Sequence, residues 1–220
     1  MSADPTTTST KVRLRFAKCG DLRLVSHHDL MRTLERTLRR ANLPVARSQG
    51  FNPRPKVVFA LALGLGIEGR REVVDLELTE PLDPVDVLTR LAAVAPPGLE
   101  FLEAQVAPPG RAPRPLTVWY ALEVPEPRRE AARAATATLL TDASRPHTRH
   151  RRDRADSQID LRPFVLDAGL DPDGVLRFRL NVGQDGSARP EEVLDTLDLR
   201  DLLDTGTILA RTEIELAPTP

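Results

Sequence analysis

Two stretches, "KVRLRF" (residues 11–16) and "SHHDLMRTLERTLRRAN" (residues 26–42), decide the fold of the first part of the chain. The first alternates cationic and apolar residues, which is typical of a strand with one face in a core. The second has apolar residues at helical spacing, and Ser26 with Asp29 three residues later forms a capping-box-like start. We therefore predict a half-buried strand followed by an amphipathic helix with an arginine stripe.

The rest of the chain continues this alternation of strands and helices. In the first half we predict a buried strand in "VVFALALGLG" (57–66), a turn at 67–71, a strand at 73–80, a helix begun by Asp83 and Pro84, and a strand at 99–106. In the second half we predict strands at 116–124, 158–164, 175–182 and 207–216, with helices at 129–140 and 190–199. The order β-α-β-β-α-β occurs twice, which predicts an α+β protein of two tandem ferredoxin-like units.

These elements predict the domain boundaries. Residues 1–10 form a loose polar tail, residues 11–106 the first unit, "APPGRAPRP" (107–115) a linker, and residues 116–220 the second unit. This topology serves many unrelated proteins, so it indicates no function by itself.

Composition excludes several classes of protein. The 220 residues are 40% hydrophobic and 29% charged, with a net charge of -1, which is ordinary for a globular protein. Cys19 is the single cysteine, so the chain cannot form an internal disulfide, a CxxC zinc site or its own Cys-ligated iron–sulfur cluster. We predict no cofactor and no metal. The start, "MSADPTTTST", has neither the cationic nor the apolar part of a signal peptide, which predicts a cytoplasmic protein with no membrane partner.

The small net charge conceals a segregation of charge. Between Lys11 and Lys56, lysines and arginines greatly outnumber the three acids, Asp21, Asp29 and Glu35. A second basic run, "RPHTRHRRDR", covers 145–154, whereas the acids concentrate in stretches such as 191–204. Segregated charge favours a polyanion or an acidic protein surface as partner. Mutual neutralisation within the fold is the alternative, and for Arg13 and Arg15 the partners would be Asp75 and Glu77 on a neighbouring strand.

The segment "SQGFNPRPK" (48–56) suits neither a helix nor a central strand. Its two prolines predict a stiff, extended loop that presents Arg54 and Lys56 on one side. Cations at fixed positions, together with amide donors, are what phosphate recognition requires. Phe51 either stacks on a base or plugs the loop into the core. The predicted nucleic-acid-binding residues are Arg36, Arg39, Arg40, Arg47, Gln49, Phe51, Asn52, Arg54 and Lys56.

The histidines offer weaker candidates for chemistry. His27 falls on the apolar side of its helix, which favours a half-buried structural residue. His28 or His150 could act as a general base, with Lys56 stabilising charge on a reacting phosphate. No spacing of Cys19 with the histidines indicates a zinc site.

Three groups of residues together resemble a known family. They are residues 15–44, "RFAKCGDLRLVSHHDLMRTLERTLRRANLP"; residues 48–69, "SQGFNPRPKVVFALALGLGIEG"; and, in the second half, "IDLRPFV" with "GSARPEEVL". This combination resembles the radical-SAM-linked, or radical-SAM-associated, family of unknown function, from about residue 11 to the end. The resemblance implies a partnership with a separately encoded radical SAM enzyme and supplies no catalytic residues. A second likeness, in fold order and in a histidine near the first helix, is to the repeat-associated CRISPR ribonucleases.

Three functions follow as hypotheses. The preferred one is an accessory RNA-binding module that works with a separate radical SAM enzyme in RNA modification or processing. The alternatives are a metal-independent endoribonuclease and a protein-only adaptor that docks on an acidic face of the radical SAM partner. The charge segregation and the resemblance favour a non-catalytic partner over an enzyme.

Overall fold

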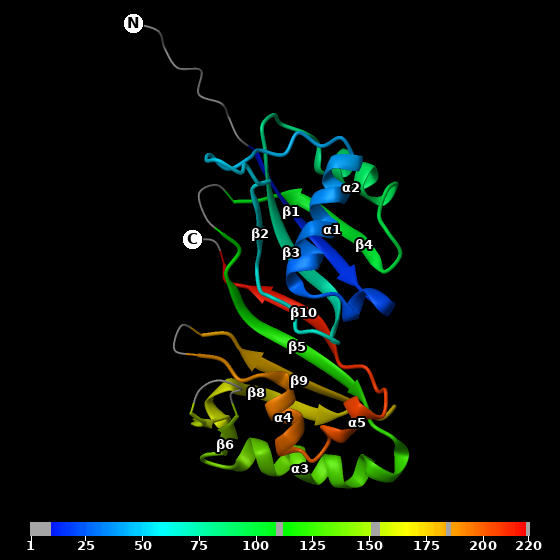
Figure 1. Ribbon diagram of the computed structural model, residues 1–220. Helices are drawn as coiled ribbons and strands as arrows, with labels where there is room; N and C mark the ends of the chain where they lie inside the picture. Colours follow the sequence, from blue (N-terminus) through cyan, green and yellow to red (C-terminus); the bar gives the residue numbers. More distant parts are fainter. Residues whose placement is uncertain (1–9, 109–111, 151–154, 184–185, 219–220) are drawn as a thin grey trace, which may run out of the picture. The chain divides into compact units, whose positions relative to one another are not determined.

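The computed structural model describes residues 10–108, 112–150, 155–183 and 186–218 (Figure 1). The protein is α+β, as predicted. It divides into two compact units, of which unit 1 comprises Met1–Arg114 with Ala217–Pro220 and unit 2 comprises Pro115–Leu216. None of the helices within the described ranges is long and apolar enough to cross a bilayer.

Unit 1 is an antiparallel sheet with two helices on one face (Figure 1). The strand order is β4-β1-β3, and β2 pairs with the other side of β3. Its elements, in chain order, are β1 (Thr10–Lys18), the 3-10 helix η1 (Gly20–Leu24), α1 (His27–Arg40), β2 (Val57–Phe59), β3 (Glu68–Leu78), α2 (Pro84–Ala92) and β4 (Leu99–Val106).

The helices of unit 1 begin where their capping residues predict. Ser26 Oγ accepts a hydrogen bond from the Asp29 backbone N–H at 3.2 Å and starts α1. Asp83 accepts from the Val85 N–H at 2.8 Å and starts α2. The apolar stripe of α1 is buried against the sheet in one core with the inward-facing residues of β1 and β3, including Leu30, Leu34, Leu38, Val12, Leu14, Phe16, Val74 and Leu76. The predicted half-buried strand and amphipathic helix are thereby confirmed.

In unit 2, four strands pair in the antiparallel order β10-β5-β9-β8. Tyr120 and Phe178 stack at their centre, with ring centroids 5.3 Å apart. A separate hairpin of β6 and β7 lies outside this sheet. The elements are β5 (Pro115–Glu123), η2 (Glu126–Arg128), α3 (Arg129–Thr141), β6 (Pro146–Arg149), β7 (Ser157–Asp160), η3 (Arg162–Phe164), β8 (Val165–Leu170), β9 (Val175–Asn181), α4 (Pro190–Thr196), α5 (Asp201–Asp204) and β10 (Ala210–Leu216).

The buried strand predicted at 57–66 is much shorter than expected. Only Val57–Phe59 forms β2, and Val58 is 44% exposed. The chain leaves the sheet after Phe59, and the loop that follows contains Gly66, whose φ of 82° disfavours any residue with a side chain. The predicted turn at 67–71 falls largely inside β3 instead. An apolar run does not distinguish a central strand from an edge strand that continues into a loop.

The strand predicted at 158–164 is also wrong in its second half. Asp160 Oδ1 accepts hydrogen bonds from the N–H groups of Arg145 and Arg162, at 2.7 and 3.0 Å, and these bonds hold the pKa of Asp160 below its usual range. The chain therefore leaves β7 and turns through η3, which contains Pro163, a residue without a backbone donor. The strand that enters the sheet is the next one, β8.

Candidate nucleic-acid interface

The segment that follows α1 runs back along the end of β3. The Ala46 N–H donates to the Glu77 carbonyl at 2.7 Å, and the Lys56 N–H donates to the Ala46 carbonyl at 2.7 Å. An antiparallel bridge pairs Arg47 with Pro55. Residues 48–54 are therefore a closed loop that is anchored to the sheet at its base.

The loop reverses direction rather than extending as predicted. The Ser48 N–H donates to the Arg54 carbonyl at 2.8 Å, and the Arg54 N–H donates to Ser48 Oγ at 3.0 Å. Gly50 has a φ of 132°, a conformation that favours glycine. The prolines stiffen the returning strand of the loop, but the glycine and the serine allow the turn.

Phe51 lies at the tip of this loop with its ring in solvent. Its relative exposure is 106%, so the alternative that it plugs the loop into the core is wrong. A fully exposed phenylalanine loses its hydrophobic stabilisation, about 1.5–3 kcal/mol for a buried side chain of this kind. The loop therefore presents an apolar ring without deriving stability from it.

Three of the predicted arginines, Arg36, Arg39 and Arg40, lie in the second half of α1, and Arg47 and Arg54 lie at the base of the loop and within it. All five are exposed, and within the described ranges none of them forms an ion pair. Arg47 Nη1 donates to the Pro53 carbonyl at 3.4 Å, which holds it beside the loop. Gln49 and Asn52 are exposed as well. We name the set the arginine–aromatic surface: Arg36, Arg39, Arg40, Arg47, Phe51 and Arg54.

Arg13, on the face of β1 that points away from the helices, is neutralised by an ion pair, unlike these arginines. Arg13 forms a two-point ion pair with Asp75, at 2.7 and 2.9 Å, and both side chains are almost buried. This confirms the predicted cross-strand neutralisation for Arg13. The unpaired charge of the basic region therefore concentrates at the arginine–aromatic surface.

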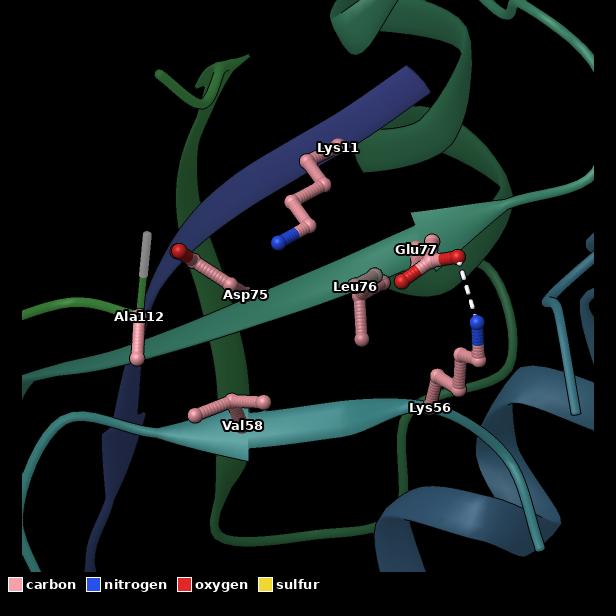
Figure 2. A pocket seen from close by; sticks show the side chains of 7 residues that line it. All are labelled: Lys11, Lys56, Val58, Asp75, Leu76, Glu77 and Ala112. Carbon is pink, nitrogen blue, oxygen red and sulfur yellow. Dashed lines mark hydrogen bonds and ion pairs between the residues drawn. The ribbon is translucent and has the colours of Figure 1, made fainter. Parts of the chain in front are cut away.

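Lys56, like Arg13, forms an ion pair with an acidic residue of β3. Its Nζ lies 2.7 Å from Glu77 Oε1, on the side of a small pocket of about 40 Å³ that is also lined by Lys11 and Asp75 (Figure 2). We predicted that Arg54 and Lys56 are two free cations on one side of an extended loop. This prediction is wrong for Lys56, because Glu77 neutralises it. A role for Lys56 in binding RNA stays a prediction.

Within unit 1, the weak catalytic candidates His28 and Lys56 do not form one site. His28 is exposed in the first turn of α1, whereas Lys56 is held by Glu77 beside the segment that follows the other end of that helix. His150 belongs to unit 2. His27 is half-buried, with its ring 5.0 Å from that of Phe59 in an edge contact, as predicted for a boundary histidine.

Unit 2 has a groove of about 410 Å³ that brings His147 and His150 together. His150 Nδ1 lies 2.9 Å from Asp156 Oδ2, and His147 Nε2 lies 4.0 Å from Asp195 Oδ2. The groove is also lined by three arginines and three acids: Arg149, Arg189, Arg200, Glu191, Glu192 and Asp195. Its charges largely cancel. Residues 151–154 of the predicted second basic run lie outside the described residues.

An ion pair between Arg149 and Glu192 links the β6–β7 hairpin to α4. The guanidinium donates to both carboxylate oxygens, at 2.5 and 2.8 Å, and the carboxylate also accepts from the Arg189 N–H at 2.8 Å. Burial raises the pKa of Glu192, but these hydrogen bonds outweigh it and hold the pKa below its usual range. The sequence holds no local signal for this pair, because its members are far apart in the chain.

One family model matches most of this chain. Residues 11–190 match the family described as "Uncharacterized protein conserved in bacteria (DUF2344)". The chain belongs to this family. DUF2344 is a domain of unknown function, as the sequence resemblance implied. No curated protein matches the chain.

One solved structure similar to this DUF2344 chain is titled "Crystal Structure of an Unknown Protein from Galdieria sulphuraria". The two sequences are 13% identical, and the match covers 96% of this chain and 99% of that one. The TM-score is 0.30, which is too low to support a conclusion. Among the described residues of the chain, no group of three or more His, Cys, Asp or Glu side chains could hold a metal ion.

Proposed function

We propose that this DUF2344 protein is an RNA-binding module that works with a separate radical SAM enzyme, in the cytoplasm, in RNA modification or processing. The observation that supports it best is the arginine–aromatic surface, where five exposed arginines, without ion pairs among the described residues, lie on α1 and in the segment that carries a fully exposed phenylalanine. Single-stranded RNA is bound by this combination, because cations hold the phosphates and aromatic rings stack on unpaired bases.

Structural roles do not account well for this set of residues. Arg39 and Arg40 do lie in the last turn of α1, where cations stabilise the helix dipole by about 0.3–1 kcal/mol each. That role does not extend to Arg47 and Arg54, which lie in the loop. Nor does it explain why the loop carries an exposed ring.

The proposed partner rests on the sequence motifs. The resemblance of residues 15–44 and 48–69 to the radical-SAM-linked family supports a radical SAM partner, and membership of DUF2344 leaves this open. Because the chain carries a single cysteine, any iron–sulfur cluster would belong to the partner.

The test is the affinity of the chain for a labelled, unstructured RNA, measured by fluorescence anisotropy across a range of salt concentrations. Arg39→Ala/Arg47→Ala/Arg54→Ala removes three exposed cations of the surface. Each phosphate contact to a single strand contributes about 0.7 to the slope of log K against log salt, so the triple variant should reduce the slope by about two.

A matched control separates this surface from the general charge of the protein. Arg70→Ala/Arg90→Ala/Arg133→Ala removes the same charge from exposed positions elsewhere and should leave the slope nearly unchanged. Equal losses in the two variants, or no RNA binding by the native chain, would contradict the proposal. If the native chain bound an acidic protein partner but no RNA, the protein-only adaptor would replace it.

A metal-independent endoribonuclease is the second candidate, and the placement of His147 and His150 in one groove favours it. Two imidazoles could serve as general base and general acid. The acids of the groove count against it, because they repel a phosphodiester. Cleavage of labelled RNA in the presence of EDTA, lost in His147→Ala/His150→Ala, would establish this activity.

We also propose that each unit is ferredoxin-like. Support comes from the strand order β4-β1-β3-β2 in unit 1 and β10-β5-β9-β8 in unit 2, each with the crossing helices that this topology requires. An experimental structure with a different strand order in either unit would contradict this assignment.

A further inference from the structure

A groove of about 210 Å³ lies beside the arginine–aromatic surface, between the end of α1 and the segment that follows it. Its lining mixes the apolar residues Leu38, Leu43, Pro44, Val45 and Pro55 with the polar residues Arg39, Asn42, Arg47 and Thr79. Both arginines are exposed, whereas Leu38 is 2% exposed. The groove thus combines apolar and polar walls with two exposed cations.

The size and lining of the groove suit one planar ring system. A volume of about 210 Å³ equals roughly seven water molecules at about 30 Å³ each. Pockets for drug-sized ligands are larger, about 300–1,000 Å³. A phosphate would lose its hydration against the apolar residues, whereas a base would bury its faces there and leave its phosphates to the arginines.

The lining also includes a single carboxylate, Glu35. It is half-buried, and within the described part of the chain it forms no ion pair, although Arg39 lies one helical turn away. An ionised carboxylate only accepts hydrogen bonds, so it is satisfied best by two adjacent donors. Among the bases of RNA, guanine presents such a pair, N1–H and N2–H, on its Watson–Crick edge.

We infer that this groove holds one unpaired guanine of a single-stranded RNA and that Glu35 selects it. The inference rests on the proposed function, since the surrounding arginines must first hold the RNA. Adenine and cytosine present one amino donor beside an acceptor nitrogen, which the carboxylate repels. Uracil presents one donor between two acceptor oxygens. A carboxylate within a cationic surface lowers the affinity for phosphate but increases the specificity for one base over the others.

The experiment measures binding of labelled hexamers of uridine that carry one central guanine, inosine, adenine or cytosine. The guanine hexamer should bind about tenfold more tightly than the adenine hexamer, which is the discrimination that one good two-point contact provides. Inosine lacks the 2-amino group and should lose most of this preference. This comparison requires no change in the protein.

Glu35→Gln completes the test, because an amide has one acceptor and one donor group and cannot accept from two adjacent donors. It should reduce the preference for guanine over adenine to less than about threefold, with the affinity for the all-uridine hexamer preserved or raised. Glu130→Gln, at an exposed position on α3, is the matched control and should keep the full preference.

The outcomes separate this inference from the proposed function. Binding of all hexamers with equal affinity would overturn the guanine site and leave RNA binding intact. A guanine preference that persists in Glu35→Gln would place the selection elsewhere and overturn it too. Failure of every hexamer to bind would contradict the proposed function itself.

Discussion

Substitution of Phe51 can test RNA binding separately from folding. Its ring contributes little to the stability of the isolated chain because it is fully exposed. If it stacks on a base, Phe51→Ala should weaken RNA binding by about 1–3 kcal/mol at an unchanged melting temperature. Anisotropy and thermal unfolding of the same preparation measure both. A fall in the melting temperature with unaltered binding would make the ring structural.

Arg54 and Lys56 have different partners, so their substitutions should have different effects. Arg54→Ala removes an exposed cation without an ion pair among the described residues and should lower the salt slope by slightly less than one. Lys56→Ala removes a cation already paired with Glu77 and should change RNA binding much less. Both variants should remain folded, since an exposed ion pair contributes about 0–1 kcal/mol. Equal losses of RNA affinity would show that Lys56 leaves Glu77 to bind RNA.

At the scale of an element, the loop at 48–54 depends on its prolines for stiffness. Pro53→Ala/Pro55→Ala keeps every cation and the ring but increases the freedom of the unbound loop. Affinity for RNA should fall by a smaller factor than in Phe51→Ala, because ordering the loop then costs free energy at binding. The salt slope should stay constant, since no phosphate contact is lost. A reduced slope would indicate that the prolines position the cations themselves.

The ion pair between the β6–β7 hairpin and α4 predicts a pH dependence of stability. Because the folded-state pKa of Glu192 is lowered, its stabilisation is complete above the unfolded value, about 4.3, and is lost as the pH falls through the lower folded value. At pH 7, Glu192→Gln should cost about 1.5–3 kcal/mol, because Arg149 loses a charged partner.

This difference between Glu192→Gln and the native chain should shrink as the pH falls below about 4. Thermal unfolding of the two proteins across pH measures it. A difference that stays constant with pH would mean that the charge on Glu192 does not stabilise the fold.

At the scale of the whole molecule, the proposal predicts an association with a radical SAM enzyme that persists when RNA binding is lost. The native chain and Arg39→Ala/Arg47→Ala/Arg54→Ala should both retain the partner in co-purification, whereas the bound RNA should be lost from the variant. Identification of proteins and sequencing of RNA from the same pull-down measure this. Loss of the enzyme together with the RNA would indicate that the arginine–aromatic surface docks the partner.

The elements whose signals are local can be predicted from the order of the amino acids. The alternation of "KVRLRF" predicted β1, and Ser26 and Asp83 predicted the first residues of α1 and α2. The spacing of apolar residues also identified the buried face of α1 and therefore the side on which its arginines lie. These predictions succeed because periodicity and capping involve residues within a few positions of one another.

Long-range packing determines which of the predicted cations have no ion pair among the described residues. Lys56 and Arg54 look equivalent in the sequence, but strand β3 brings Glu77 to one of them and no carboxylate to the other. The run at 57–66 became a three-residue strand because it lies at one side of β3, where apolar residues are less enclosed.

Three other features also depend on segments that meet only in the fold. They are the exposure of Phe51, the groove beside Glu35 and the ion pair of Arg149 with Glu192. Such contacts are set by strand pairing across long stretches of chain, and no local pattern encodes them.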